Sequence, residues 1–397
     1  MSGDARKLIL GIETSCDETA ASVILLEDLG KSPVSPRVLS NVVASQHDLH
    51  GRFGGVVPEL ASRRHVEMIE PILRAALEDA GVALGEIGAV AVTRGPGLVI
   101  ALLVGLSAAK AIAWSRGIPL IGVHHLAGHI YSLFLDDPGP EERSGVVGGA
   151  PPFPHLALVV SGGHTDFYRV EGLGREVHLG GTLDDAVGEA YDKVAASMGV
   201  GYPGGPRVDK LHAEFRAAAR PGEEPVSLPR PYLEGKPYNF SFSGLKTAVL
   251  SYLRERGLYH DDPSLAPWAR AGGMTEGEAR ALAAGFQEAA VDVLVEKVDR
   301  ASRAQRLRAV SVSGGVASNR HLRDCLARRA QASGWTLHLP ARRYCTDNAA
   351  MIACAGAFAL KAGDGAGDYL ALDADPAWEL DSPGGVSVAR KKGRRRG

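Results

Sequence analysis

The sequence predicts a duplicated α/β fold, in which two related domains flank a ligand-binding cleft. Strand-like apolar runs alternate with helical patterns along most of the chain, which is typical of sheets with mostly parallel strands. Two of these runs, HLALVVSGGHT (residues 155–165) and RAVSVSGGVAS (residues 308–318), end in the same Ser-Gly-Gly turn, which suggests an internal duplication. The chain has 397 residues. Because a single core stops growing at roughly 250–300 residues, two domains are expected.

The first domain is assigned to residues 1–135. Lys7–Leu26 predicts a strand, a turn and a second strand, because an apolar run ends at Gly11 and a β-rich run begins near Ala21. The apolar pattern then predicts a helix at 64–80, a strand at 87–93, a helix at 102–114, a strand at 118–123 and a helical segment at 124–133.

The second domain is assigned to residues 155–345, after a Pro- and Gly-rich charged loop at 136–154. The expected elements are a strand at 156–160, a helix at 183–198, a turn-rich stretch at 200–240, helices at 242–256 and 275–304, a strand at 308–312, a helix at 319–333, an extended segment at 337–339 and a helix at 347–361. We expect the helix within 346–361 to pack back on the first domain, and residues 382–397 to form a disordered basic tail.

The composition is that of an ordinary globular protein, with 45% hydrophobic and 23% charged residues. A net charge of −2 argues against a wholly basic nucleic-acid binder, although the basic run at 390–396 attracts phosphate unless it is simply a solvated end. The four cysteines form no Cys-x-x-Cys pair, so neither a zinc knuckle nor a disulfide framework is indicated and a reducing cytoplasm fits. No N-terminal signal and no apolar segment of ~18 residues is expected, hence no membrane association.

The sharpest local pattern is the pair His125 and His129. On a helix, residues i and i+4 lie on one face about one turn apart, so both imidazoles can bind the same metal ion. Two imidazoles rarely suffice, and a carboxylate from elsewhere in the chain is expected to complete the site. The alternative interpretation is that both histidines lie on a helix surface or are hydrogen-bonded within the core.

The candidate third ligand is Asp347, in a polar segment that opens a helix of small residues. The alternative interpretation is that Thr346 or Asp347 caps that helix. A set of two histidines and one aspartate leaves coordination positions open, as a catalytic or ligand-binding metal needs, and it suits Zn(II) or Fe(II).

Other patterns suggest a ligand site near the glycine-rich turns. Ser-Gly-Gly turns expose backbone N–H groups at the carboxyl ends of strands, where phosphates and nucleotides bind. Asp185, Glu189 and Asp192 would share one face of the expected helix, either as a solvated surface or as ligand contacts. The segment Tyr202–Pro206 (YPGGP) is either a backbone approach to a ligand or a tight loop.

Nine segments, in order, resemble one family closely: GIETSCDETA, FGGVVPELASRRH, VHHLAGH, LVVSGGHT, DDAVGEAYDK, GYPGGP, FSFSGLKTAV, SGGVASN and CTDNAAM. Together they look like the bacterial tRNA threonylcarbamoyl transferases (TsaD), a family that also bears the older label of sialoglycoprotein endopeptidase. The resemblance covers the chain from about residue 8 to residue 361. The 136–154 loop and the basic tail look like departures from the family pattern.

The resemblance implies the two-domain fold of actin, Hsp70 and sugar kinases (ASKHA). It implies transfer of a threonylcarbamoyl group from threonylcarbamoyl-adenylate to the N6 amine of the adenosine 3′ of the anticodon, in tRNAs that read ANN codons, with release of AMP. It also implies two protein partners, a shorter paralogue without the metal site (TsaB) and a small P-loop ATPase (TsaE).

The resemblance further assigns roles to residues. His125, His129 and Asp347 become the ligands of one divalent metal, Fe(II) or Zn(II). The implied contacts to the donor are Val159, Val160, Ser161, Gly162, Gly163, Asp192, Gly205, Asp209 and Asn319. The sequence pattern alone does not prefer Asp192 to Asp185 or Glu189. No general base is assigned, because an activated carbamoyl donor needs little base; Glu13 and Asp17 are the carboxylates considered for that role.

Three rival functions are disfavoured. A zincin protease needs His-Glu-x-x-His, whereas Leu126 follows His125 here. A kinase of the same fold would hold Mg²⁺ with carboxylates rather than with paired histidines, although fold alone does not exclude it. A non-catalytic paralogue would not be expected to keep both histidines and Asp347.

Overall fold

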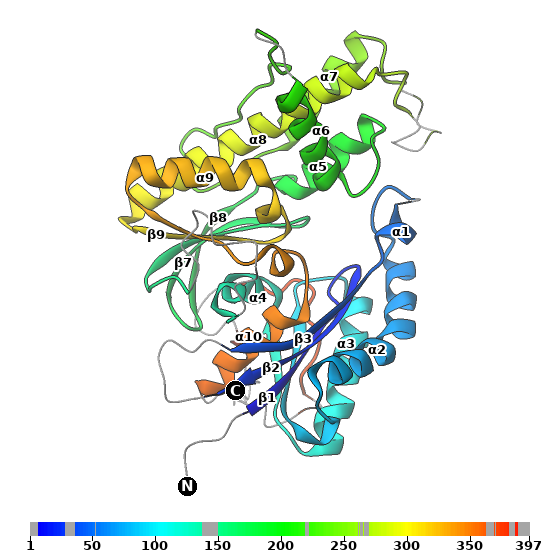
Figure 1. The fold of residues 1–397 in the computed structure, drawn as a ribbon, viewed down its shortest axis with the longest axis vertical. Helices are drawn as coiled ribbons and strands as arrows, with labels where there is room; N and C mark the ends of the chain where they lie inside the picture. Colours follow the sequence, from blue (N-terminus) through cyan, green and yellow to red (C-terminus); the bar gives the residue numbers. More distant parts are fainter. Residues whose placement is uncertain are drawn as a thin grey trace, which may run out of the picture.

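The computed structural model describes residues 7–27, 36–51, 53–136, 150–218, 222–260, 262, 265, 270–362, 369, 371–380 and 386–387. Most of the expected 136–154 loop and nearly all of the expected disordered tail lie outside these residues. Within the tail, residues 386 and 387 form a short strand. The expected domain boundaries stay predictions. The described residues form two α/β lobes, one above the other in Figure 1.

The N-lobe is built on a six-stranded sheet of order β11-β5-β4-β1-β2-β3. Its strands are β1 (Lys7–Glu13), β2 (Glu18–Leu26), β3 (Arg37–Ser45), β4 (Ile87–Gly95), β5 (Leu120–His124) and β11 (Val386–Ser387). Strands β1, β4 and β5 run parallel, whereas β2, β3 and β11 are antiparallel to their neighbours. The expected strand–turn–strand at the start of the chain is therefore the β1–β2 hairpin.

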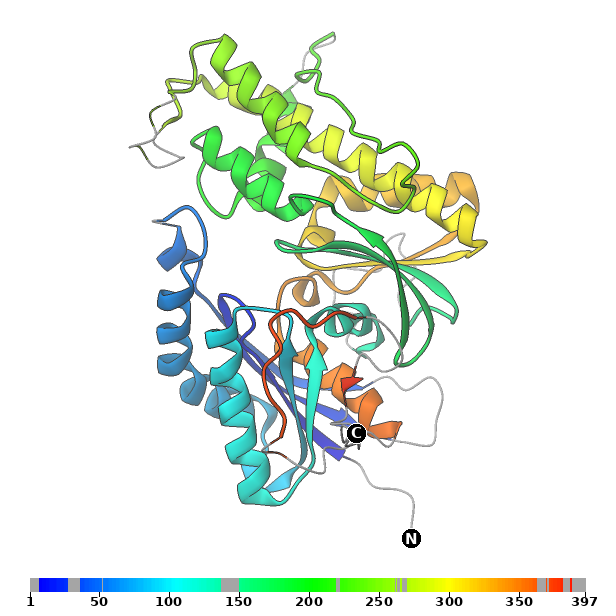
Figure 2. The same cartoon turned by 180° about the vertical axis from the view of Figure 1, so that it is seen from behind.

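Helices cover both faces of this sheet, because successive side chains of a strand point to opposite faces. On one face, Leu10 and Val90 pack with α3 (Val99–Arg116) and α2 (Pro58–Ala80). On the other, Ile9 and Ala89 pack with α10 (Ala349–Lys361). Figures 1 and 2 show α2 and α3 on the side of the sheet away from α10. The central strands are thus buried on both faces, which explains their continuous apolar runs.

The C-lobe is built on a five-stranded sheet of order β10-β9-β6-β7-β8. Its elements are β6 (His155–Val160), β7 (Thr165–Gly172), β8 (Arg175–Gly181), α5 (Val187–Ser197), α6 (Gly204–Ala218), α7 (Ser243–Glu255), α8 (Glu276–Gln305), β9 (Ala309–Ser313), α9 (Arg320–Ser333) and β10 (Thr336–His338). The helices cover one face of the sheet, where Leu158 and Val312 join their apolar side chains in one core. Helix α8 begins with a capping box, in which Thr275 and Glu278 satisfy each other's backbone N–H groups.

Helix α4 (His125–Tyr131) lies buried where the lobes meet. Its Ala127 and Ile130 share a core with Ala91 of β4 and with Val159 of β6, which belong to different lobes. Short helices complete the fold: α1 (His47–His50), η1 (Leu84–Glu86), η2 (Ser132–Phe134), η4 (Gly315–Ser318) and η5 (Arg342–Tyr344). A helix at the junction can present side chains to any ligand held between the lobes.

Two expectations about the C-lobe were wrong. The helix expected at 183–198 begins only at Val187, because Asp184 instead accepts hydrogen bonds from the backbone N–H and hydroxyl of Ser243. The stretch expected to be turn-rich contains α6, whose start is obscured in the sequence by Gly204, Gly205 and Pro206. Proline is tolerated in the first helical turn because the N–H groups there have no intrahelical acceptor. In addition, the sequence did not predict strand β3 of the N-lobe or strands β7 and β8 of the C-lobe.

The expectation that no segment could cross a membrane needs a correction at α3. This helix has 18 residues and a mean hydropathy of 1.5, which makes it long and apolar enough by composition, and 33% of it is buried. Its inner side chains, such as Leu102 and Leu106, are fully buried. Length and composition are weak evidence for a membrane span, because core helices of soluble proteins meet the same criterion.

Candidate metal centre and ligand-binding turns

Helix α4 places the two expected metal-binding histidines together. His124 ends β5, and its Nδ1 accepts a hydrogen bond of 3.1 Å from the backbone N–H of Leu126, which caps the helix. His125 and His129 follow one turn apart on the same face, with ring centroids 4.8 Å apart. Both side chains are buried.

The loop before α10 brings Asp347 to this pair. Its Oδ1 lies 3.4 Å from Nε2 of His125 and 3.1 Å from Nε2 of His129. The cap of α10 is Asn348, whose side chain accepts a hydrogen bond of 3.0 Å from Met351 N. The alternative that Thr346 or Asp347 caps the helix is therefore wrong.

The donor atoms of these three residues fit a divalent metal ion. One ligand atom from each of His125, His129 and Asp347 lies within 4.8 Å of the others. Both ring nitrogens of His129 are buried without a hydrogen-bond partner, although Oδ1 of Asp347 lies 3.1 Å from Nε2. A buried imidazole without partners is costly unless it binds something. Two nitrogens and one oxygen leave coordination positions open for a ligand.

Glu13 lies behind the centre and orients His125. Its Oε2 is 3.0 Å from Nδ1 of His125, so this nitrogen donates and Nε2 remains as the ligand atom. The same oxygen accepts a hydrogen bond of 2.6 Å from the hydroxyl of Thr93, and Oε1 accepts one from Ser15 N. Glu13, a carboxylate considered as a general base, is fully buried and engaged by these three partners.

The charges around the centre perturb each ligand differently. Burial lowers the pKa of His125, but the carboxylates of Asp347 and Glu13 outweigh it and raise the pKa well above its usual value. Burial raises the pKa of Asp347, but His125 outweighs it and holds the pKa well below its usual range. Burial lowers the pKa of His129, so that ring is neutral at neutral pH, as a metal ligand must be.

The two Ser-Gly-Gly turns lie against each other at the ends of the paired parallel strands β6 and β9. A Cβ on Gly314, whose φ is +93°, would lie 2.3 Å from the carbonyl oxygen of Val160, so only glycine permits this approach. In the first turn, Ser161 N already donates to the carbonyl of His164 at 2.8 Å. A Cβ on Gly162 or Gly163 would meet nothing within 4 Å, so these two residues border open space.

Val159 and Val160 precede this turn, and their side chains are wholly buried. Val159 belongs to the core at the lobe junction and Val160 to the C-lobe core. They can therefore contribute to a ligand site only through the backbone or by fixing the turn.

Asp192 and Gly205 lie at the junction of α5 and α6. Oδ1 of Asp192 accepts a hydrogen bond of 2.7 Å from Gly204 N at the start of α6. Burial raises the pKa of Asp192 to about 6. A Cβ on Gly205 would meet nothing within 4 Å, so the start of α6 also borders open space. Asp185, in contrast, precedes α5 and pairs with Lys193 and Lys246, so the predicted acidic face does not exist.

Asp209 and Asn319 are joined by a residue that the sequence did not single out. Gln287 of α8 donates to Asp209 Oδ1 at 3.0 Å and accepts from Asn319 Nδ2 at 2.9 Å. Asn319 also caps α9, with Oδ1 accepting from Leu322 N at 2.9 Å. The amide of Gln287 therefore fixes both side chains. No sequence pattern marks this residue, because it looks like any polar position of a long helix.

His164 is a second residue that sequence analysis missed. It follows the Ser161–Gly163 turn and is close enough to the centre that His125, His129 and Asp347 affect its titration. Burial is the main reason that its pKa falls to about 4. A neutral imidazole thus lies near enough to the metal ligands to be affected by their charges.

Asp17, the other carboxylate considered as a base, is not a member of the histidine centre. It forms a separate group with Glu18 and His47, within 4.8 Å of one another.

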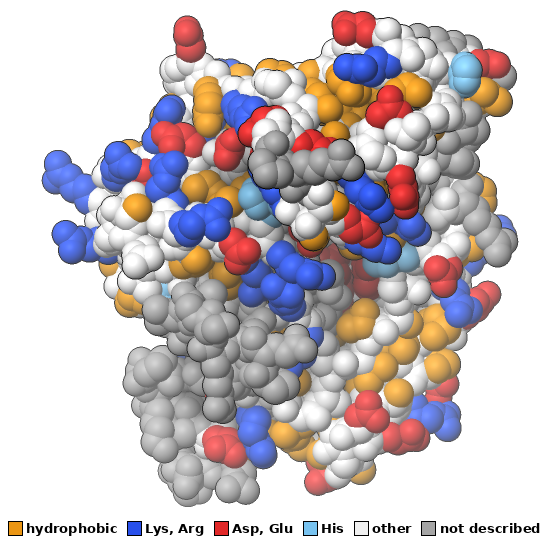
Figure 3. Space-filling view, turned by 45° about the horizontal axis from the view of Figure 1, so that its top comes forward, with side chains coloured by type: hydrophobic (Ala, Val, Ile, Leu, Met, Phe, Trp, Pro, Cys, Tyr) orange, Lys and Arg blue, Asp and Glu red, His pale blue; other side chains and the backbone are white. Residues whose placement is uncertain are grey.

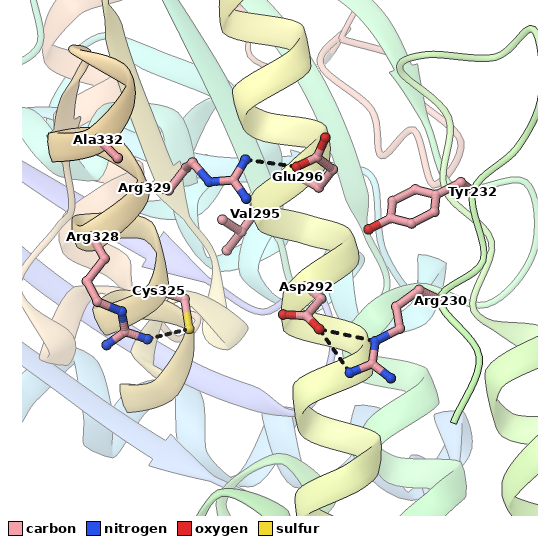
Figure 4. A pocket seen from close by; sticks show the side chains of 9 residues that line it. All are labelled: Arg230, Tyr232, Asp292, Val295, Glu296, Cys325, Arg328, Arg329 and Ala332. Carbon is pink, nitrogen blue, oxygen red and sulfur yellow. Dashed lines mark hydrogen bonds and ion pairs between the residues drawn. The ribbon is translucent and has the colours of Figure 1, made fainter. Parts of the chain in front are cut away.

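A groove on the C-lobe surface is distinct from all of these residues. It has a volume of 650 Å³ and lies between α8 and α9, beside the chain segment that carries Arg230 and Tyr232 (Figure 4). Arg230 pairs with Asp292, and Arg329 pairs with Glu296, across this groove. Because no predicted site residue lines this groove, it is not the candidate site.

Two α/β lobes with glycine turns at their strand ends and a centre of two histidines and one aspartate define a two-lobed protein of the actin, Hsp70 and sugar-kinase class with a candidate mononuclear metal site. The family model of the tRNA N6-adenosine threonylcarbamoyltransferases (TsaD) matches residues 37–354. The chain belongs to this family, whose members are transferases that modify tRNA.

Individual relatives support the same family. A tRNA N6-adenosine threonylcarbamoyltransferase of Symbiobacterium thermophilum is 52% identical over 364 residues, which cover 91% of this chain and 94% of the relative. The Bacillus subtilis protein of the same name is 47% identical over 384 residues, which cover 96% of this chain and 98% of the relative. The predicted family and enzyme class are confirmed, and the kinase, protease and scaffold alternatives lose their support.

Solved structures support the fold. The crystal structure of HypF from T. kodakarensis matches with a TM-score of 0.51 at 13% identity, over 91% of this chain and 49% of that one. Full-length HypF in a phosphate- and nucleotide-bound form matches with a TM-score of 0.50 at 14% identity, over 91% of this chain and 47% of that one. At such identities the likeness concerns the fold alone, and the predicted two-lobed α/β class is confirmed.

Proposed function

We propose that this protein transfers the threonylcarbamoyl group of threonylcarbamoyl-adenylate to the N6 amine of the adenosine 3′ of the anticodon, in tRNAs that read ANN codons. The amine forms a bond to the carbamoyl carbon, the bond from that carbon to the phosphate oxygen breaks, and AMP and a proton leave. The observation that carries the proposal is the fully buried His129, which has no hydrogen-bond partner and faces Asp347 and His125.

His125, His129 and Asp347 would hold one divalent metal, Fe(II) or Zn(II). When bound, the metal supplies a Lewis acid and a template for the threonylcarbamoyl end of the donor. The Nδ1–H of His125 stays hydrogen-bonded to Glu13, which fixes the tautomer that leaves Nε2 toward the ligand. Glu13 therefore has a positioning role in this proposal rather than that of a general base.

The adenylate end of the donor would lie along the glycine-bordered side of the C-lobe. The backbone N–H groups of Gly162 and Gly163 are suited to a phosphate oxygen, because these residues border open space and are exposed. Asp209 and Asn319, held in place by Gln287, are suited to the hydroxyl groups of a ribose. Asp192 and Gly205 would position the start of α6 beside the same ligand, while Val159, Val160 and Ser161 fix the turn.

Partner proteins would bind the exposed face of α2 and α3. This face carries apolar side chains that the described residues leave exposed: Val66, Val99, Ile100, Leu103 and Trp114. Such a stripe is typical of a protein interface. We assign it to the shorter TsaB-like paralogue, whose docking would also account for the apolar character of α3; a TsaE-like ATPase would join this pair. The cytoplasm is the compartment that fits a tRNA substrate.

The test is mass spectrometry of tRNA nucleosides from host cells depleted of the protein. We expect threonylcarbamoyladenosine to fall, wild type to restore it, and His129→Ala to fail while remaining folded. Glu255→Gln, a change at an exposed position of α7 and away from the proposed partner surface, is the matched control and should restore the nucleoside. A nucleoside level unchanged by verified depletion would contradict the proposed reaction. Rescue by a His129→Ala protein would contradict only the metal assignment.

A further inference from the structure

A second group of potential ligands lies outside the histidine centre, at the β1–β2 turn. Asp17 and Glu18 are adjacent in the chain, and His47 reaches them from α1. Nε2 of His47 lies 3.3 Å from Oε1 of Glu18 and 3.9 Å from Oδ2 of Asp17. None of these side chains is a ligand of the histidine centre.

One buried carboxylate oxygen of this group has no hydrogen-bond partner among the described residues, which indicates that the group can bind an ion. Oδ2 of Asp17 is buried and has no hydrogen-bond partner, and the side chain of Asp17 is only 9% exposed. This oxygen lies 3.9 Å from Nε2 of His47, and one ligand atom from each of Asp17, Glu18 and His47 lies within 4.8 Å of the others. A buried carboxylate oxygen without a donor is costly, and a cation would satisfy it.

The charge of the surroundings favours a cation as well. Burial and the neighbouring Asp17 raise the pKa of Glu18 to about 8, although His47 opposes the shift. The hydrogen bond to Glu18, and the charges of Asp17 and Asp192, raise the pKa of His47 although burial opposes them. Two buried carboxylates therefore share a single imidazole.

The position of this group also bears on ligand binding between the lobes. The ring of His47, in the N-lobe, meets the ring of Tyr202, in the C-lobe, edge-on at a centroid distance of 6.0 Å. Asp17 also contributes to the raised pKa of Asp192, beside the start of α6. Figure 3 shows acidic side chains (red) within the hollow between the lobes and basic side chains (blue) on its rim.

We propose that Asp17, Glu18 and His47 form a second divalent-cation site, separate from the histidine centre. Two carboxylates and one imidazole suit Mn²⁺ or Mg²⁺, with water completing the coordination. Ligand atoms of an octahedral ion lie about 3 Å apart, so the separation of 3.3 Å between His47 and Glu18 already fits and Asp17 needs a small movement. A cation bound here reduces the repulsion between the carboxylates of Asp17 and Glu18 and an anionic ligand.

The test is a titration of the full-length protein with Mn²⁺, followed by electron paramagnetic resonance. His129→Ala disables the histidine centre, and we expect this variant to keep one bound Mn²⁺ per chain. Adding Glu18→Gln should weaken that binding at least about tenfold, as loss of a ligand does. Adding Asp48→Asn instead, a change at the exposed neighbour of His47, should leave the affinity unchanged.

Two results would overturn the proposal: a His129→Ala protein that binds no Mn²⁺, or a Glu18→Gln change that leaves the affinity intact. If His129→Ala fails to fold, wild type and Glu18→Gln are compared directly. Wild type should then bind one more Mn²⁺ than the variant, and equal stoichiometry overturns the site. The readout is independent of transferase activity, so it does not depend on the proposed reaction.

Discussion

Glu13 and His125 form the contact that ties the metal centre to the N-lobe sheet. Glu13 ends β1, His125 begins α4, and their side chains meet with 3.0 Å between Oε2 and Nδ1. The two residues are more than a hundred positions apart in the sequence. Through this contact, the end of a strand supports a metal ligand. It also explains why a carboxylate in the first strand is fully buried.

Replacing Glu13 by Gln should weaken metal binding without abolishing it. The amide keeps the size of the side chain but loses the charge that orients and polarises His125. We expect metal affinity to fall about 10–100-fold, the usual effect of losing such a partner. Competition with a chelator, read as metal content per chain, measures this change.

The matched control is Glu59→Gln, which removes an exposed carboxylate from α2. It should leave metal affinity unchanged. Unaltered affinity in Glu13→Gln would show that the contact with His125 does not support the centre.

Alanine substitutions at two glycines on facing segments should separate an effect on ligand binding from an effect on folding. Gly163→Ala places a methyl group in open space, so the free energy of unfolding should change little. In Gly188→Ala, the new Cβ would lie 2.5 Å from the carbonyl oxygen of Ser161. That overlap should destabilise the fold by about 1–3 kcal/mol. Denaturant unfolding compares the two proteins.

The same pair tests the proposed donor position. Because a methyl group on Gly163 would fill the space beside the turn, KM for the donor should rise while stability stays near that of wild type. A Gly163→Ala protein with unaltered KM would place the donor elsewhere.

The sequence predicted best those features that depend on neighbours along the chain. The spacing of His125 and His129 suffices to place both rings on one face of a helix. Which of three successive polar residues caps α10 was not predictable, because Thr346, Asp347 and Asn348 are all good caps. Because α4 packs close to this segment in the folded chain, Asp347 contacts the two histidines and Asn348 caps the helix.

Features that depend on distant segments were missed or wrong. Asp185 matched a helical face by spacing, but Lys246, which lies far along the chain, pairs with it before the helix begins. Gln287 is a site residue only because Asp209 and Asn319 lie on either side of its amide. Periodicity carries no information about such contacts.

Removing the cap of α10 should weaken the metal centre indirectly. Asn348→Ala loses the hydrogen bond to Met351 N and should cost about 1 kcal/mol of stability. Because Asp347 precedes the cap, its position should become less fixed and metal affinity should fall several-fold. Asn348→Asp keeps an acceptor for Met351 N but loses the Nδ2 donor to the carbonyl oxygens of Tyr344 and Thr346, so it should not restore stability. Equal metal affinity in Asn348→Ala and wild type would show that the cap does not position Asp347.

The buried carboxylate of Asp192 should make stability depend on pH in a direction opposite to that of a salt-bridged aspartate. Its pKa is raised to about 6 by burial, whereas an unfolded aspartate titrates near 3.9. The folded protein thus binds the proton more tightly than the unfolded chain does. Burial of this carboxylate therefore does not lower the free energy of unfolding below pH ~4, and it lowers it by the full amount above pH ~6. Asp192→Asn should therefore raise the free energy of unfolding by about 1–3 kcal/mol at pH 8 and leave it nearly unchanged at pH 4.

Chemical denaturation of both proteins at the two pH values measures this difference, with Glu59→Gln as an exposed control. A protein that retains a destabilising carboxylate does so for a reason other than stability. Asp192→Asn should accordingly gain stability at pH 8 while its KM for the donor rises. If it gains stability and keeps full activity, Asp192 only caps α6 through its bond to Gly204 N, and the ligand lies further along the cleft.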